Sequence, residues 1–436
     1  MFAPQNDDRM NEAFLQYVWQ YQLFDMEELC TTAGDPLQIV TPGVLNRDAG
    51  PDFKGAVIRI GDIVWAGDVE IHVRSSDWYR HHHEDDEKYK MVTLHVVYEH
   101  DREVERLPGE LYPTFEIRGR VLPDMYERYQ ELVGTLDQMP CQSFLSDISL
   151  LTIRSQMESV LMERLLRKQS QVRETVSQCH GDWQEALYRH LAVGFGMKTN
   201  ADAFELLAKS LPYKIISRHT ESVLQVQALV FGQAGMLEVA QGDDHYRMLK
   251  AEYDYLRYKY QLTPIATYHW NLLRLRPSNF PCIRLSQFAT LLYEIPDLWS
   301  ELTHRSDMAY WWRRFAVSAD AYWEHHYHFN KETSIHHVAL GEASIALLFI
   351  NTVIPVLFSY WHFQGDEEKM ELALDMLGEI PFEDNRVTRR FATTAFPQEH
   401  ASDSQALIEL YTRYCQPRRC LECAIGDCIV KSSKNL

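Results

Sequence analysis

The chain lacks the short motifs that identify the most familiar catalytic sites. Its 436 residues contain no GxxxxGK[ST] phosphate loop, no GxSxG nucleophile turn and no HExxH zinc helix. Positive charge is also scarce, with 43 Lys and Arg against 62 Asp and Glu and a net charge of −19. This balance excludes a uniformly basic nucleic-acid-binding surface, but a local basic groove remains compatible with it.

Secretion signals are likewise missing. The opening stretch MFAPQNDDRMNEAFLQ has no basic region followed by an apolar one, and eight cysteines in a chain this long do not form a small secreted disulfide framework. One stretch, Ala343 to Trp361, has 19 residues without a formal charge. Asn351, Thr352 and Pro355 interrupt it and no Lys or Arg flanks it closely, so we interpret it as a buried core helix. We therefore expect a soluble, cytoplasmic protein without a membrane partner.

Two compositional regimes predict a mixed α+β fold. Residues 36–122 favour β-branched residues and alternation, which predicts a mixed sheet: two strands around a Gly61-Asp62 turn, a third ending near Val73, and further strands in KMVTLHVVYEH and YPTFEIRGRVL. A helix in NEAFLQYVWQYQLF precedes them, and DWYRHHHEDDEKYK reads as a short helix or a loop. We place the domain boundary near Leu122, giving an α/β domain over 1–122 and a mostly helical domain over 123–436.

Amphipathic stretches predict the helices of the second domain. The expected helices cover residues 149–178, 182–195, 199–210, 220–232, 246–260, 285–297, 306–328, 338–361 and 403–415.

Polar residues alternate along the strand DVEIHVR. Glu70, His72 and Arg74 share one face, while the other face is apolar and should point to the core. Asp52 precedes the hairpin, so chain reversal can bring it beside Glu70. Paired carboxylates suit Mg²⁺ or Mn²⁺, which prefer oxygen ligands, and such an ion can activate water for phosphoryl chemistry.

The order of these features resembles that of the PD-(D/E)XK nucleases. An acidic residue comes first and a hairpin follows. At the end of the next strand, an acid stands two positions before a basic residue. The resemblance implies that Asp52 and Glu70 hold the metal, that His72 stands in place of the usual Lys, and that Glu12 is the additional helical acid of some members. Because imidazole has no permanent charge at neutral pH, we expect Arg74 or Lys54 to supply the positive charge that the Lys would otherwise provide.

The chain also resembles domain-of-unknown-function family 2851, a family of uncharacterised bacterial proteins. This resemblance rests on GPDF, WAGDVEIHVRSSDW, VTLHVVYEHD, RPSNFPCIRLSQ, INTVIPVLF and the terminal YC…CLECAIG, and spans nearly the whole chain. It implies no established activity.

Histidines are abundant around this strand. His95 is expected on the polar face with Glu70, and the run His81, His82 and His83 reads either as a transition-metal site or as a solvated loop. Farther along, His325, His326 and His328 are expected on an aromatic-rich helix as packing or surface residues.

Four cysteines cluster near the C-terminus with the spacing C-x4-C-x2-C-x4-C. Their thiolates suit Zn²⁺ or an iron–sulfur cluster, and Cys420 and Cys423 form the strongest chelating pair. The alternative is a terminal segment with incidental cysteines. The four are Cys415, Cys420, Cys423 and Cys428.

Three functional interpretations stay open. In the first, a metal-dependent nuclease binds nucleic acid through basic groups in residues 153–173, 386–390 and 412–436, with the Arg-rich 274–285 segment as a structured loop. In the second, the chain is a catalytically inactive nuclease-like scaffold for protein or nucleic-acid interaction. In the third, the cysteines bind a structural metal and the strand face binds a partner. The sequence leaves the oligomeric state and the substrate open.

Overall fold

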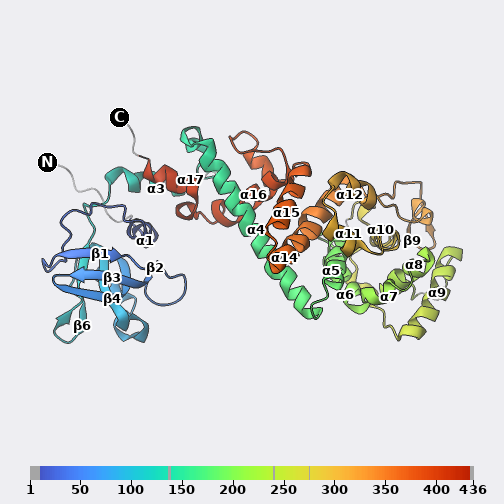
Figure 1. Ribbon diagram of the computed structural model, residues 1–436, viewed down its shortest axis with the longest axis horizontal. Helices are drawn as coiled ribbons and strands as arrows, with labels where there is room; N and C mark the ends of the chain where they lie inside the picture. Colours follow the sequence, from blue (N-terminus) through green and yellow to red (C-terminus); the bar gives the residue numbers. More distant parts are fainter. Residues whose placement is uncertain (1–9, 136–138, 239–240, 274, 433–436) are drawn as a thin grey trace. The chain divides into compact units, whose positions relative to one another are not determined.

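The computed structural model describes residues 10–135, 139–238, 241–273 and 275–432. Its chain divides into two units, Met1–Gln156 with Tyr411–Leu436, and Met157–Leu410. The first unit holds a mixed sheet with helices and the second is mostly helical (Figure 1), which confirms the predicted α+β class. The division differs from the predicted boundary after residue 122, because the first unit continues to Gln156 and includes the C-terminal segment.

The sheet of the first unit has the strand order β1-β3-β4-β5-β8, with the short β2 paired to β3. The β1–β3 and β3–β4 pairs are antiparallel, whereas β4–β5 and β5–β8 are parallel. Helix α1 packs against β4 through a face that includes the buried Phe14, Val18 and Trp19. The elements are α1 (Glu12–Gln20), β1 (Leu37–Thr41), β2 (Val44–Leu45), β3 (Phe53–Ile60), β4 (Ile63–Arg74), β5 (Val92–Glu99) and β8 (Thr114–Glu116).

A single strand, β4, replaces the two that the sequence predicted between Ile63 and Val73. Gly67 lies inside this strand, where it lets β5 come close. A Cβ added at Gly67 would lie 2.4 Å from Thr93 Cγ2 and 2.5 Å from the Met91 carbonyl oxygen. A glycine inside a strand pattern therefore marks a close backbone approach here, and the predicted hairpin turn at Gly61 is retained with a positive φ of 57°.

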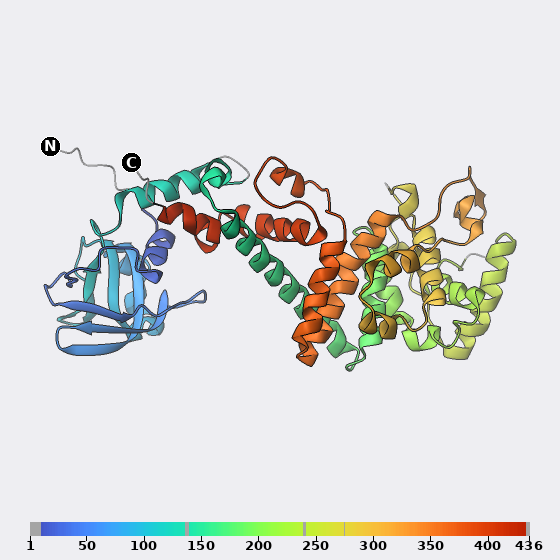
Figure 2. The same ribbon diagram turned by 45° about the horizontal axis from the view of Figure 1, so that its top comes forward.

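The other elements of the first unit flank the sheet. Between β4 and β5 lie the short helix α2 (Asp77–Arg80) and 3₁₀ turns, in agreement with the predicted short helix or loop. Helix α17 (Ala424–Lys431) packs beside α3 (Pro123–Gly134), as both ribbon views show (Figures 1 and 2). The Arg128 side chain donates to the Val430 carbonyl oxygen, so the C-terminal segment is bound to α3. A small hairpin pairs β6 (Glu105–Leu107) with β7 (Glu110–Leu111).

The second unit buries one large hydrophobic core between its helices. Helix α4 starts in the first unit and continues into this one. The helices are α4 (Leu150–Gln178), α5 (Trp183–Gly196), α6 (Ala201–Ser210), α7 (Tyr213–Ile216), α8 (Val223–Gln233), α9 (Asp244–Tyr260), α10 (Pro281–Glu294), α11 (Leu298–His304), α12 (Met308–Phe315), α13 (Glu342–Leu348), α14 (Ile354–Gln364), α15 (Glu367–Glu379) and α16 (Ala401–Leu410).

The long helix predicted over 306–328 is wrong beyond Phe315. Helix α12 ends there, Asp320 caps a separate 3₁₀ turn, and the chain then forms a hairpin of β9 (His326–His328) and β10 (Lys331–Glu332). Asn330 makes the turn with a positive φ of 63°, a conformation that Asn tolerates better than most residues. The histidines expected on a helix, His325, His326 and His328, thus belong to the turn and hairpin.

The apolar stretch Glu342–Gln364 is long and apolar enough to cross a membrane, and 67% of its most apolar window is buried inside the protein. Helices α13 and α14 are joined here by a π-helical turn, Phe349–Val353. The side chains of Val353, Leu357 and Phe358 lie in the core of the second unit, as the interpretation of a core helix requires.

Gly232 tests how tightly this core is packed. A Cβ at Gly232 on α8 would lie 2.1 Å from the Tyr253 ring on α9, so we expect Gly232→Ala to lower the free energy of unfolding by about 2 kcal/mol. Gly378→Ala is the matched control, because a Cβ there meets open space in α15 and should raise stability by about 0.5–1 kcal/mol. Urea denaturation followed by circular dichroism measures both. Equal effects of the two variants would contradict the packing.

Candidate metal centre

Asp52 and Glu70 lie side by side where the β3–β4 hairpin opens. Phe53 pairs with Val69, so the residues flanking this pair become neighbours. The backbone N–H of Asp52 donates to Glu70 Oε2 at 3.0 Å, and the N–H of Ile71 donates to Asp52 Oδ2 at 3.1 Å. The hairpin backbone therefore fixes both carboxyl groups.

Helix α1 contributes two further side chains. Gln16 Nε2 donates to Asp52 Oδ1 at 2.8 Å, and Glu12, one turn earlier on the same helix face, lies close enough to influence the pKa values of Asp52 and Glu70. The sequence singled out Glu12 only through the nuclease resemblance and missed Gln16. The available signal was the spacing of four residues, which places both side chains on one face of the helix.

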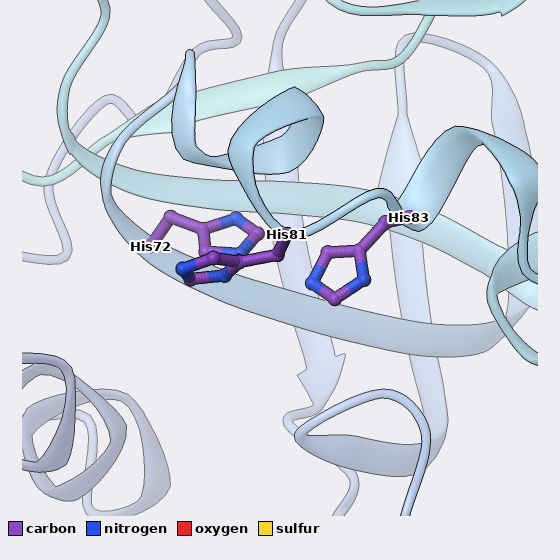
Figure 3. A group of neighbouring side chains, drawn as sticks. All are labelled: His72, His81 and His83. Atoms are coloured by element: carbon purple, nitrogen blue, oxygen red, sulfur yellow. The ribbon is translucent and has the colours of Figure 1, made fainter.

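Three histidines converge beside Glu70 (Figure 3). Ring nitrogens of His72, His81 and His83 all lie within 4.8 Å of one another, and His72 Nε2 is 3.2 Å from His81 Nδ1. Glu70 Oε1 is 3.2 Å from His83 Nε2 and 3.6 Å from His72 Nε2. Three imidazoles and a carboxylate thus point their donor atoms at one place.

A layer of side chains behind the histidines holds their rings. His72 Nδ1 is 2.9 Å from Nε2 of the buried His95 on β5, which places His95 on the polar face as predicted. Tyr89 stacks on His83 with ring centroids 3.8 Å apart, and the buried Trp78 contacts the rings of His72, His83 and His95 edge-on. The orientation of the imidazoles is therefore set by packing as well as by hydrogen bonds.

Burial dominates the electrostatics of this cluster. It raises the pKa of Asp52 to about 7, with the neighbouring Glu70 adding to the rise, and it raises the pKa of Glu70 to about 8. It also lowers the pKa of His72 to about 2 and that of His95 to about 3. In the absence of a cation, neutral carboxyl groups and neutral imidazoles are favoured. A divalent cation stabilises the carboxylate form, and neutral imidazoles offer it their lone pairs without first losing a proton. The cluster therefore suits a metal ion.

The donor spacing fits a single ion. Ligands about 2.1 Å from a shared metal stand about 3.0–3.5 Å apart in tetrahedral or octahedral geometry. The separations of 3.2 Å between Glu70 Oε1 and His83 Nε2 and between His72 Nε2 and His81 Nδ1 fall in this range, and Glu70 Oε1 is slightly farther, at 3.6 Å, from His72 Nε2. Imidazole donors suit Mn²⁺, Fe²⁺ or Zn²⁺ better than Mg²⁺. Among the Mg²⁺ and Mn²⁺ ions expected from the sequence, this donor set favours Mn²⁺.

The two basic residues expected to supply positive charge at the metal site, Arg74 and Lys54, lie in different surroundings. Arg74 Nε lies 3.6 Å from Glu99 Oε2, because β4 ends at Arg74 and its side chain pairs across to β5. Lys54 stands on β3 two residues after Asp52 and is exposed. Arg74 thus forms an ion pair at the strand end, and its role at the site stays a prediction.

A cleft of about 630 Å³ opens beside His83. Its rim carries more acidic than basic groups, with Glu84, Asp86, Glu105 and Glu110 against Lys90 and Arg106. The loop before β3 carries Arg47, which pairs with Glu422, and Gly50, which lies close to Lys88.

Three of the four predicted cysteine ligands lie together. Cys415, Cys420 and Cys423 line one small cavity, but the fourth thiol there belongs to Cys141, and Cys428 is not among the lining residues. Burial raises the pKa of the Cys141 and Cys420 thiols to about 12. Cys428 lies on α17, where it is half-buried.

The basic stretches expected to bind nucleic acid are partly engaged within the second unit. Arg167 donates two hydrogen bonds to Glu409, Lys168 donates to the Asn351 carbonyl oxygen and side chain, and Arg389 pairs with Asp384. Residues 164–168 therefore join α4 to neighbouring elements. The segment 274–285, apart from Arg274, which lies outside the described residues, forms a 3₁₀ turn and the start of α10.

Comparison with known proteins gives one match. Residues 12–386 match the model of a family described as a protein of unknown function, DUF2851. No curated protein and no solved structure matches the chain.

The histidine run offers a matched test of the metal centre. We expect His83→Ala and Glu70→Gln each to weaken Mn²⁺ or Zn²⁺ binding by about tenfold or more, because each removes a converging donor. His82→Asn is the control, since His82 is exposed and Asn tolerates its positive φ of 60°. Isothermal titration calorimetry measures the affinities. Unchanged binding in Glu70→Gln and His83→Ala would contradict a shared ion.

Proposed function

Because the chain belongs to the family of proteins of unknown function DUF2851, its activity has to be inferred from the site, and we propose that it is a metal-dependent phosphodiester hydrolase acting on nucleic acid. The observation that carries the proposal is the convergence of Asp52, Glu70 and the histidines at the open end of the β3–β4 hairpin.

The order of elements around this point supports a nuclease-like core. A helix is followed by three antiparallel strands, a short helical crossover and a parallel strand, and the two acids lie before β3 and on β4. This is the arrangement expected from the PD-(D/E)XK resemblance. The crossover is shorter than a full helix, because only α2 and 3₁₀ turns join β4 to β5.

The residues divide into metal-holding and proton-accepting groups. Glu70, His72, His81 and His83 hold the ion, and Asp52 supports Glu70 through the hairpin backbone. An ion held there would supply an acidified water and would stabilise charge on the phosphoryl oxygens. Glu12, on the facing helix α1, would accept the proton of the attacking water.

In this proposal His72 has a different role from the Lys of the resembling nucleases. Its neutral imidazole would use Nε2 as a ligand, which requires the proton on Nδ1, and Nδ1 lies 2.9 Å from His95 Nε2, which can accept that proton in a hydrogen bond. The positive charge that a Lys would supply comes from the metal and from Lys54. A strand of nucleic acid approaches from the side of Lys54, because the rim of the cleft beside His83 is acidic and repels phosphate.

Substitutions at Glu12 and Glu70 distinguish a loss of catalysis from a loss of metal binding. We expect Glu70→Gln to lose both Mn²⁺ and cleavage, whereas Glu12→Gln keeps Mn²⁺ and loses cleavage by about 100-fold or more. Labelled single- and double-stranded DNA and RNA serve as substrates, with Mn²⁺ or with EDTA. Calorimetry on the same preparations reports the bound metal.

The control variant is Asp62→Asn, which removes a carboxylate at the opposite end of the hairpin. Purified in parallel, it should cleave like the unmodified protein, which excludes contaminating nucleases as the source of activity. Nucleic-acid binding without cleavage by any variant or by the unmodified protein would overturn the enzymatic proposal and favour an inactive scaffold.

A further inference from the structure

Four cysteine thiols from two distant parts of the sequence line one small cavity in the first unit. Cys141 follows α3, while Cys415, Cys420 and Cys423 belong to the C-terminal segment. The cavity has a volume of about 20 Å³, and the three C-terminal cysteines are only 7–8% exposed. None of these four cysteines is joined in a disulfide in the structure.

Hydrogen bonds hold both sides of the cavity in place. Arg418, two residues before Cys420, donates to the Thr135 carbonyl oxygen at 2.8 Å. The N–H of Ala424, which follows Cys423 directly, donates to Gln156 Oε1 at 2.7 Å. Arg128 adds its bonds to Val430. The cysteines are therefore brought together by a network of contacts that does not involve sulfur.

The turn that carries the C-x2-C pair leaves no room for a larger side chain. Cys420 begins a 3₁₀ turn, Cys423 caps the start of α17, and Gly426 follows one turn later. A Cβ at Gly426 would lie 2.0 Å from the Cys420 carbonyl oxygen, so only glycine allows this approach. The pair is thus held with both cysteines lining the cavity.

The donor set determines the class of ligand. The other side chains on the cavity are apolar or aromatic, including Leu132, Pro140 and Tyr414, so sulfur is the donor type that the cavity offers. Four thiolates bind Zn²⁺ in tetrahedral geometry or hold an iron–sulfur cluster, whereas Mg²⁺ and Ca²⁺ require oxygen ligands.

We propose that Cys141, Cys415, Cys420 and Cys423 together bind one thiolate-ligated metal centre that fastens the C-terminal segment to α3. Cys141 is the fourth ligand, in the place that the C-terminal spacing gave to Cys428. The centre is distinct from the histidine cluster in both its residues and its donor chemistry.

The test compares full-length protein with its cysteine variants, all purified without oxygen in the Glu70→Gln background, so that any metal left at the weakened histidine cluster is the same in each preparation. Elemental analysis for zinc and iron, with acid-labile sulfide, identifies the centre: zinc without sulfide is a mononuclear site, and iron with sulfide is a cluster. We expect Cys141→Ser to lose most of this metal. Cys428→Ser should retain it.

A second measurement keeps the proposal falsifiable if Cys141→Ser folds poorly. Co²⁺ added to metal-free, reduced protein gives a thiolate-to-metal charge-transfer absorption whose intensity rises with the number of sulfur ligands. We expect the intensity to fall in Cys141→Ser and to stay unchanged in Cys428→Ser. The proposal is overturned if the protein holds no zinc or iron and takes up no Co²⁺, if Cys428→Ser alone loses the metal, or if mass spectrometry finds these cysteines paired as disulfides.

Discussion

The first unit is organised around two carboxyl groups that the β3–β4 hairpin holds away from water. Asp52 and Glu70 are linked through the backbone N–H groups of Asp52 and Ile71, so neither side chain can turn toward solvent without breaking a hairpin contact. Burying two acids this close together is unfavourable unless protons or a cation neutralise them. Helix α1 must then present a polar residue at this point, and Gln16 does so by donating to Asp52.

The same constraint explains why so many histidines surround the acids. A lysine placed among these groups would carry a charge into a buried region, whereas an imidazole can stay neutral and still offer a lone pair. Burial lowers the pKa of His72 to about 2, so it remains neutral at any physiological pH. The departure from the Lys of the nuclease pattern is therefore compatible with metal chemistry when the imidazole acts as a ligand, with His95 fixing its tautomer.

Local rules of the sequence predicted the strand face but not the segments that close over it. The alternation along β4 and β5 placed Glu70, His72 and His95 on one face because the side-chain period of a strand is two. Alternation could not show that Arg74 is already at the strand end, where it pairs with Glu99.

Long-range contacts were harder to predict. His81 and His83 reach the acids through a non-repetitive turn with a left-handed residue between them, which no periodicity encodes. Cys141 joins the C-terminal cysteines through the packing of α3 against α17, a contact between segments far apart in the sequence. Cys428 is closer in the sequence to Cys415, Cys420 and Cys423 than Cys141 is, but this spacing did not indicate which cysteine lines the cavity. Helix α17 follows directly after Cys423 and carries Cys428 beyond the cavity.

The two donor sets differ in access as well as in chemistry, and this difference assigns them different tasks. The histidine cluster includes the exposed His81 and adjoins a cleft of about 630 Å³, whereas the thiols line a cavity of about 20 Å³ among apolar side chains. A catalytic metal needs an open coordination position for water or substrate, and a structural metal has all its positions filled by the protein. Soft thiolates and mixed carboxylate–imidazole donors also differ in the ions they prefer. On this argument the proposed thiolate centre would hold the C-terminal segment on α3, and the proposed histidine centre would be the one open to water and substrate.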